Sequence, residues 1–293
     1  MEQLSDKIAV VTGAASGIGR AMAERFAAEG MHVVLADVEA GPLKDATEAL
    51  RTTGARVLAV ETDVSDRGSV DTLAAATLDE FGVPNVVCNN AGVSGGLGGA
   101  IWETTPTDWE WVMGVNLMGV VHGIQAFVPA MLEAGHQGHI VNTSSVLGLS
   151  TGGGSIYSTT KHAVTRLTEG LWYDLRAANS AIGASVLCPG LIATQIVTSG
   201  RNRPEHLRGG DSTASAEVAE RMQAVQSYFL ESGMPPAEVA GMVVDAIRDD
   251  RFYVLTHPEM ILASVESRMS GILEGTSPPP ERPMGDLLGR SGP

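Results

Sequence analysis

The feature of this sequence that most constrains its fold is a repeated alternation of short, β-branched apolar runs with longer amphipathic segments. Strand-like runs separated by helical segments are typical of βαβ units, in which parallel strands form one sheet. Because such crossovers are right-handed, they place helices on both faces of that sheet. The sequence therefore predicts an α/β fold with a doubly wound parallel sheet of about seven strands.

The boundaries of the elements follow from the runs and the turn residues between them. The expected strands are 8–11, 33–36, 57–60, 86–89, 139–143, 184–188 and 252–255. The expected helices are 18–29, 41–53, 67–81, 106–134 and 157–178, with another after Pro258. One sheet organises all of these elements, so we expect residues 1–275 to form a single domain.

Residues 195–234 contain no expected strand, which is long for a plain connection and indicates a lid over the substrate site. Within it, Val218, Met222, Val225 and Phe229 recur at helical spacing, and Ser212 or Thr213 could cap that helix. Residues 276–293 are rich in proline and glycine, and we expect them to form a tail rather than a core element.

Charge and hydropathy limit the classes of partner. The net charge of −15 repels phosphate backbones and anionic lipid, and no basic patch opposes it, so we expect neither a nucleic-acid nor a membrane partner. No uncharged apolar run is expected to approach the ~18 residues of a membrane span. The N-terminal MEQLSDKIAVVTG is interpreted as a first strand rather than a signal peptide, which predicts a cytoplasmic protein. No metal site is expected.

A glycine-rich turn, residues 12–19 (TGAASGIG), directly follows the first expected strand and opens the first expected helix. Free N–H groups and the helix dipole attract a pyrophosphate at such a place. Gly13 permits the tight turn, Gly17 lets the backbone approach the phosphates, and Gly19 lets helix and strand pack closely. Glycines also serve ordinary turns, but this context predicts a dinucleotide site on a Rossmann-like sheet, with Ser16 and Ile18 as further contacts.

Asp37 ends the second expected strand, where a carboxylate can accept hydrogen bonds from the adenosine ribose hydroxyls. A 2′-phosphate there would face a like charge, and no Arg or Lys occupies Ser16 or Val38 to neutralise it. We therefore predict NAD(H) rather than NADP(H), although a solvated Asp at a strand end is the plainer alternative. The third and fourth strands should bring further cofactor contacts to the same edge, namely Asp63, Val64, Asn90 and Gly92.

Tyr157 and Lys161 carry the catalytic hypothesis. Four residues apart on a helix, they share one face, so the ammonium lies near the phenol. A free phenol has a pKa near ~10, and an adjacent cation stabilises the phenolate, which makes Tyr157 a candidate general base or acid. A Tyr and a Lys four residues apart on a helix usually lie on the protein surface and have no catalytic role. Here it follows a strand ending in Thr143-Ser144-Ser145, whose hydroxyls could hold a substrate oxygen.

With these residues the chain resembles the short-chain dehydrogenase/reductase family over about residues 5–195. TGAASGIG is similar to the family's cofactor turn, NNAG to its fourth-strand motif, and YSTTK to its Tyr-x-x-Ser-Lys sequence, with Thr160 replacing serine. The resemblance implies that Tyr157 and Lys161 also bind the cofactor, and that Asn116 supports a water-linked proton relay through Lys161, a ribose hydroxyl and Tyr157. It also implies a segment that contacts the nicotinamide carboxamide, from which we assign Pro189, Gly190, Ile192 and Thr194.

The chain departs from the family pattern in one spacing: Ser145 stands twelve residues before Tyr157, whereas thirteen is usual. Either the intervening loop is one residue shorter, or Ser144 is the catalytic serine. We assign Ser145, because Ser145-Val146-Leu147-Gly148 matches the family's Ser-x-x-Gly sequence and the Gly152–Gly154 loop can absorb a deletion. Ser144 would then face away along the strand.

The C-terminus lacks the family's usual ending and extends into another helix, which is similar to a branch that includes dehydrogenases of bulky aryl alcohols. We expect a small-molecule substrate, an apolar secondary alcohol or ketone. The side chains expected to wall its pocket are Leu97, Ile101, Trp102, Leu147, Leu149, Ile196 and Tyr228. The apolar surface of helices 106–134 and 157–178 further predicts a homodimer or homotetramer.

Two other classes of protein remain open. A non-catalytic NAD(H)-binding sensor would keep the glycine turn but has no need for Ser145, Tyr157 and Lys161 together. A lyase on the same fold, such as a halohydrin dehalogenase, would be expected to lose the cofactor turn and to carry Arg in place of Lys161. The sequence has neither of these changes.

Overall fold

The structure, a computed structural model, describes residues 1–95, 100–152, 155–208 and 216–278. The strands are β1 (Ile8–Thr12), β2 (His32–Asp37), β3 (Val57–Glu61), β4 (Val86–Asn89), β5 (Gly138–Thr143), β6 (Ile182–Cys188) and β7 (Tyr253–Leu255). The α-helices of these ranges are α1 (Gly17–Ala28), α2 (Ala40–Thr52), α3 (Arg67–Glu80), α4 (Pro106–Met113), α5 (Gly119–Ala134), α6 (Ile156–Ala177), α7 (Ala216–Ser232), α8 (Pro236–Asp249) and α9 (Pro258–Glu274).

The strands form one seven-stranded parallel sheet in the order β3-β2-β1-β4-β5-β6-β7. Strand order reverses between β1 and β4, so the crevice for a ligand opens at the carboxyl ends of these two strands. The predicted doubly wound, Rossmann-like α/β sheet is therefore confirmed.

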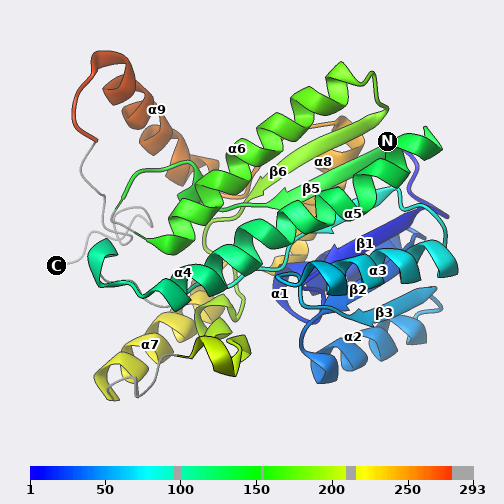
Figure 1. Ribbon diagram of the computed structural model, residues 1–293, viewed down its shortest axis with the longest axis horizontal. Helices are drawn as coiled ribbons and strands as arrows, with labels where there is room; N and C mark the ends of the chain where they lie inside the picture. Colours follow the sequence, from blue (N-terminus) through cyan, green and yellow to red (C-terminus); the bar gives the residue numbers. More distant parts are fainter. Residues whose placement is uncertain (96–99, 153–154, 209–215, 279–293) are drawn as a thin grey trace.

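Helices cover both faces of the sheet, and each face has its own apolar core. On one face α1, α2 and α8 pack through side chains that include Phe26, Leu43 and Val243. On the other, α3, α5 and α6 pack through Leu73, Phe127 and Leu171. In Figure 1, α5 and α6 run in similar directions, with β5 and β6 visible between them. The sheet is thus buried on both sides, and only its edges leave room for a ligand.

The long helix expected over 106–134 is not uniform. Between α4 and α5, residues Gly114–Met118 form a π-helical turn, a wider turn that is frequent at functional sites. By length and composition alone, one helical stretch of the described residues, Pro106–Ala134, could cross a membrane, because an 18-residue window in it has a mean hydropathy of 1.5. This corrects the expectation that no uncharged run would be long enough. Here Phe127, Val128 and Met131 of this stretch pack in the core against the sheet.

The same packing reduces the apolar surface of helices 106–134 and 157–178 that is left for contact with a second copy of the chain. Several side chains counted as surplus apolar surface are buried within one chain: Val112, Val120, Phe127, Val128, Val164 and Leu171. Met118 and Leu132 remain exposed on this helical stretch, and Trp172 of α6 is partly exposed. The outward apolar surface is therefore narrower than the sequence suggested.

The expected lid, 195–234, contains the short 3-10 helices η4 (Ile196–Asn202) and η5 (Glu205–Leu207), and then α7. The two flanks of this segment meet in a bridge between Ile192 and Met234, where the Ala193 N–H donates to the Met234 carbonyl at 3.0 Å. Ser212 and Thr213, the expected caps, lie outside the described residues.

Two helices, α8 and α9, follow the lid segment in the chain. The expected elements include none between 234 and 252, and α8 fills that interval and packs against α1, with Val239, Val243 and Ile247 fully buried. The helix expected after Pro258 is α9, which extends away from the sheet in Figure 1. Of the proposed tail 276–293, residues 279–293 lie outside the described part of the chain.

Candidate active site

Tyr157 lies in the first turn of α6, beyond the carboxyl end of β5. Ser155 caps this helix, its side chain accepting a hydrogen bond from the Ser158 N–H at 3.4 Å, so the helix begins where the sequence predicts. Lys161 follows one turn later and is fully buried at 2% exposure. Its Nζ lies 5.5 Å from the centroid of the Tyr157 ring. The structure therefore brings these two predicted residues together.

Lys161 is held by the end of β5. Its Nζ donates a hydrogen bond to the Thr143 carbonyl at 2.9 Å, and burial lowers the pKa of the ammonium to about 8. Gly92 approaches closely: a Cβ on this glycine would lie 3.4 Å from both Lys161 Nζ and Asn116 Oδ1. These are ordinary van der Waals distances, so the loop after β4 lies directly against both side chains.

The pKa of Tyr157 departs from the simplest expectation. Burial raises the pKa of the phenol, and the largest influence that opposes it is a hydrogen bond from the Ser145 side chain rather than the charge of Lys161. In this environment the neutral phenol is favoured.

Ser144 and Ser145 have different surroundings. The Ser144 hydroxyl donates to the Lys161 carbonyl at 2.8 Å and lies 2.8 Å from Thr165 Oγ1, so it points into α6. The Ser145 hydroxyl faces Tyr157 and lies 3.4 Å from the Pro189 carbonyl. Gly148, the last residue of the Ser-x-x-Gly sequence, packs on α6 so closely that a Cβ would lie 2.7 Å from the Lys161 carbonyl. Adjacent residues of an extended strand point to opposite sides, which explains the difference.

Asn116 lies in the π-helical turn and is completely buried. Its side chain clamps the Val93 peptide, with Oδ1 accepting from the Val93 N–H at 2.8 Å and Nδ2 donating to the Val93 carbonyl at 3.0 Å. The same Nδ2 donates to Thr160 Oγ1 at 3.2 Å, so the threonine that replaces serine in YSTTK joins the clamp. The clamp fixes the β4 loop against α6, beside Lys161.

The glycine turn has the shape of a phosphate cradle. Gly13 has φ +67°, and a Cβ there would lie 2.9 Å from Ala91 Cα. A Cβ on Gly19 would lie 2.0 Å from the Gly13 carbonyl oxygen, so both positions exclude side chains. Within the described residues, Ser16 makes no side-chain hydrogen bond to cap α1, and Ile18 lies in its first turn. The free N–H groups of α1 fit a pyrophosphate.

Asn90 ties this turn to β4. Its Nδ2 donates to the Thr12 carbonyl at 3.0 Å, and its Oδ1 accepts from Thr143 Oγ1 at 3.2 Å. Thr194 approaches the turn from the other side, with Cγ2 3.1 Å from where a Cβ on Gly17 would stand. The predicted residues of β1, β4 and the segment after β6 therefore gather at one edge of the sheet, where open α/β sheets bind ligands; this edge is the predicted cofactor groove.

Asp37 is buried at the carboxyl end of β2. One carboxylate oxygen accepts the Ala15 N–H at 2.9 Å and the other accepts the Glu39 N–H at 3.0 Å. Burial nevertheless raises the pKa of this carboxyl group, and these two hydrogen bonds oppose the rise. Asp37 is therefore a fixed acceptor at the groove and not a solvated side chain.

Asp63 and Val64, two further predicted cofactor contacts, make close contacts within the protein. Asp63 Oδ1 accepts hydrogen bonds from the backbone N–H of Ser65 at 2.9 Å and from its hydroxyl at 2.6 Å. Val64 is buried, and its side chain packs so tightly on Gly119 that a Cβ there would lie 2.7 Å from Val64 Cγ2. Both residues shape the loop that follows β3.

The segment after β6 lines the opposite side of the groove. The Pro189 carbonyl accepts the Val146 N–H at 2.9 Å, and the Gly190 N–H donates to Thr256 Oγ1 at 2.9 Å. Ile192 is buried at the bridge to Met234. These contacts fix the backbone beside Ser145.

Lid residues that the sequence did not single out also reach this site. Gln226 of α7 donates from Nε2 to the Thr194 carbonyl at 2.9 Å. Its Oε1 is buried and has no hydrogen-bond partner among the described residues. Ser199 accepts the Ser94 N–H at 2.9 Å. Helical spacing had marked α7, but it could not show which loop α7 contacts.

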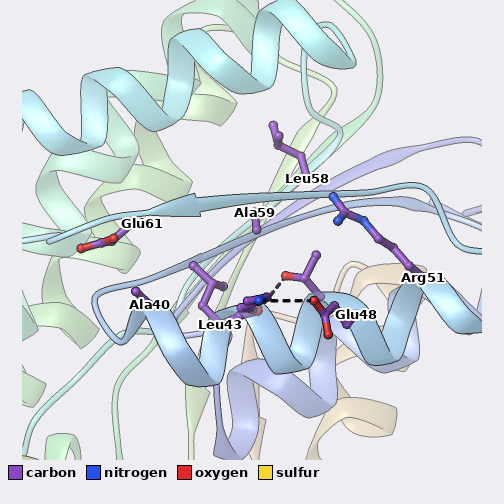
Figure 2. Close-up of a pocket in the computed structure, with 9 residues that line it drawn as sticks. Ala40, Leu43, Glu48, Arg51, Leu58, Ala59 and Glu61 are labelled. Atoms are coloured by element: carbon purple, nitrogen blue, oxygen red, sulfur yellow. Dashed lines mark hydrogen bonds and ion pairs between the residues drawn. The ribbon is translucent and has the colours of Figure 1, made fainter.

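The side chains expected to wall the substrate pocket differ in their exposure to solvent. Leu147, Leu149, Ile196 and Tyr228 are partly buried, whereas Ile101 is exposed and Trp102 is 84% exposed. Leu97 and the Gly153-Gly154 part of the glycine loop lie outside the described residues. Figure 2 shows a groove of about 300 Å³ between α2 and the edge strand β3, lined by Leu43, Leu58 and charged side chains. That groove contains none of the predicted site residues.

Comparison with known proteins gives this arrangement a family. The family model described as short chain dehydrogenase matches residues 7–205. A short-chain dehydrogenase/reductase from Burkholderia phymatum, solved in complex with NAD, is 43% identical with a TM-score of 0.91, and the alignment covers 97% of this chain and all of that one. The 1-deoxy-11-beta-hydroxypentalenate dehydrogenase of Streptomyces exfoliatus is 36% identical over 97% of this chain and 94% of its own length. The C alpha-dehydrogenase of Sphingobium sp. strain SYK-6 is 31% identical over 97% and 91%, respectively.

The chain belongs to the short-chain dehydrogenase family. It is therefore an oxidoreductase of the dehydrogenase type that acts on a small molecule.

Proposed function

We propose that this protein interconverts a secondary alcohol and a ketone with NAD(H), using Tyr157 as the general base or acid. The observation that carries the proposal is the hydroxyl pair of Ser145 and Tyr157, placed beside the buried Lys161 at the carboxyl edge of the sheet. A bound nicotinamide supplies the two-electron hydride chemistry. The protein's own residues orient the substrate oxygen and move its proton.

Each residue has a role that follows from its contacts. Ser145 holds the substrate oxygen by a hydrogen bond, and Tyr157 takes the proton from an alcohol or returns it to a ketone oxygen. Lys161 supplies positive charge near the phenol, and its burial makes that charge act over a short, poorly screened distance. Asn116 positions the β4 loop through its clamp on Val93.

NAD(H) is the proposed cofactor. Asp37 offers carboxylate oxygens at the end of β2, and it would repel a 2′-phosphate. The Burkholderia phymatum relative was solved with NAD, which supports the same choice. We expect kcat/KM for NAD⁺ to exceed that for NADP⁺ by about tenfold or more, a difference of at least ~1.4 kcal/mol. Asp37→Ala should narrow the gap, and equal use of both cofactors by the wild type would contradict the assignment.

The proposed substrate is bulky and apolar or aromatic. Leu147, Leu149 and Tyr228 are the partly buried side chains that we expect to supply the apolar wall of its pocket. The relatives' names, a hydroxypentalenate dehydrogenase and a C alpha-dehydrogenase, support a large carbon skeleton. A panel of aromatic, alicyclic and aliphatic secondary alcohols with NAD⁺, followed by the absorbance of the reduced cofactor, tests this. Preference for small aliphatic alcohols would contradict it.

We further propose a cytoplasmic protein that forms at least a homodimer. Met118 and Leu132 are exposed on the α4–α5 stretch, and Trp172 is partly exposed on the neighbouring α6. Pairing these helices with a second copy would bury that surface in an isologous contact. Light scattering at micromolar concentration should give a mass of two chains or more. A mass near 30.5 kDa with activity intact would contradict the proposal.

A further inference from the structure

A guanidinium from the lid reaches the adenosine end of the groove. Arg201 of η4 forms a bidentate ion pair with Glu39, with Nε 2.9 Å from Oε1 and Nη2 2.7 Å from Oε2. The two residues are 162 positions apart in the sequence. Positions 16 and 38, beside the glycine turn and β2, carry no cation. Arg201 is far from both in the sequence, so local spacing does not reveal it.

Glu39 stands directly beside the proposed ribose acceptor. It precedes the first residue of α2, and its N–H donates to Asp37 Oδ1 at 3.0 Å. The hydrogen bond that Arg201 donates to Glu39 is the largest cause that raises the pKa of Arg201, and the charge of Asp37 is close enough to raise it further. Asp37, Glu39 and Arg201 therefore form one charge cluster, at the corner where a 2′ substituent on the ribose would emerge.

The lid also holds Arg201 independently of Glu39. Its Nη1 donates to the Thr198 carbonyl at 3.1 Å, within the same short helix. The side chains of Arg201 and Glu39 are 36% and 19% exposed, so solvent only partly screens the pair. If the charge of Glu39 were removed, the guanidinium would keep this anchor near Asp37.

We propose that Glu39 masks Arg201, and that this masking determines how strongly the groove rejects a 2′-phosphorylated adenosine. The inference rests on the proposed dinucleotide binding in this groove. With Glu39 ionised, two carboxylates face one guanidinium, and a phosphate meets net negative charge. With Glu39 neutral, Arg201 is free to form a charge-assisted pair with a phosphate. Glu39 and Arg201 are thus specificity-determining residues that act together with Asp37.

The test compares two ligands that differ only in the 2′-phosphate: adenosine 5′-monophosphate and adenosine 2′,5′-bisphosphate. Dissociation constants are measured by isothermal titration calorimetry on the full chain, so the readout does not depend on turnover. The variants are Glu39→Gln and the double variant Glu39→Gln/Arg201→Gln. The matched control is Glu48→Gln, which removes the same charge beside Lys44 on α2, 3.9 Å away in the wild type.

We expect Glu39→Gln to improve binding of the bisphosphate relative to the monophosphate by about fivefold or more, as one gained charge-assisted pair would. The double variant should lose that gain, and Glu48→Gln should show none. Asp37 remains in every variant, so the monophosphate should still bind.

Two results would overturn the inference while the groove still binds the monophosphate. One is an unchanged ratio in Glu39→Gln. The other is a gain that persists in the double variant, because relief of repulsion alone would then explain it. If the wild type binds neither the monophosphate nor NAD⁺, the proposed function itself fails and the inference falls with it.

Discussion

Strands β5 and β6 carry a polar cluster near each of their ends, and the two clusters differ in how completely they are satisfied. Near the carboxyl ends, the Ser145 hydroxyl faces Tyr157, donates a long hydrogen bond of 3.4 Å to the Pro189 carbonyl and accepts one of 3.2 Å from the Leu147 N–H. Toward the amino ends, Ser185 Oγ lies 2.7 Å from His139 Nε2 and donates to the Arg251 carbonyl at 2.6 Å.

The second cluster has the residue types of a Ser-His-Asp triad, because Asp250 lies 3.9 Å from His139 Nδ1. However, Ser185 is fully buried, and its hydroxyl proton is committed to a backbone carbonyl. A hydroxyl with short internal bonds stabilises the fold, whereas one with a weak internal bond is available to a substrate. Residue types alone do not separate these two cases.

Tyr157→Phe should have the largest effect. Removing the phenol oxygen eliminates proton transfer, and we expect kcat to fall by ~10³-fold or more, near the upper part of the range for general acid–base catalysis. Cofactor binding, measured by calorimetry, should change little. Tyr253→Phe is the control, since Tyr253 is exposed and bonds to Glu169 at 2.8 Å. Retention of a tenth of the activity by Tyr157→Phe would remove Tyr157 from the mechanism.

Ser145→Ala should come next. Loss of a donor to a substrate oxygen costs about 10²-fold in kcat. Ser144→Ala should be much milder in kcat, but it should lower the free energy of unfolding by ~1–3 kcal/mol, because Ser144 bonds internally to α6. Initial rates and urea denaturation of both variants distinguish the two roles. The reverse order of kcat values would assign the role to Ser144.

His139 should affect stability rather than activity. Burial and the nearby N-terminal ammonium lower its pKa to about 3, so the folded state holds a neutral imidazole while the unfolded chain titrates near ~6.5. The stabilisation is complete above the unfolded pKa and is lost as pH falls toward the folded pKa. Asp250 Oδ1 lies 3.9 Å from His139 Nδ1, and the other carboxylate oxygen of Asp250 lies 2.9 Å from Arg176 Nη2.

Between pH 7 and pH 5, we expect the wild type to lose about 2 kcal/mol of unfolding free energy relative to His139→Gln. Urea denaturation of both proteins at each pH measures the difference. A difference between the two proteins that does not change with pH would mean that the folded state accepts the imidazolium.

The smallest effect should be that of Ser185→Ala on catalysis. Because Ser185 is committed to Arg251 and His139, kcat should stay within about twofold of the wild type, while unfolding free energy falls by ~1–3 kcal/mol. Initial rates with the best alcohol of the panel provide the measurement. A large loss of kcat would mean that the two clusters are coupled and would break the comparison.

Local pattern predicted the sheet well. Each strand begins and ends within two residues of its expected place, because alternating apolar runs and turn residues are local signals. Helix α8 was missed although Val239, Val243 and Ile247 have helical spacing, so that signal was present. The spacing of Tyr157 and Lys161 likewise placed both side chains on one face of α6.

Contacts across the groove could not be predicted in the same way. The ion pair of Arg201 with Glu39 and the hydrogen bond of Gln226 to Thr194 join segments whose separation is set by the fold. The pKa of Tyr157 also depended on burial, which no spacing reports. Sequence therefore predicted the identity of candidate groups better than their electrostatic environment.

The bridge between Ile192 and Met234 has a consequence for how this protein could change its substrate. It joins the two flanks of the lid, with the Met234 N–H donating to the Leu191 carbonyl at 2.9 Å. The described elements between Ile192 and Met234, namely η4, η5 and α7, lie outside the sheet. Doubling the length of a loop whose ends are joined costs only ~0.6 kcal/mol in closure entropy. Insertions between Arg201 and Gln226 would leave the strands, Tyr157, Thr194 and the glycine turn in place. One contiguous stretch of the gene encodes this part of the lid, so changes confined to that stretch could give the protein a new substrate.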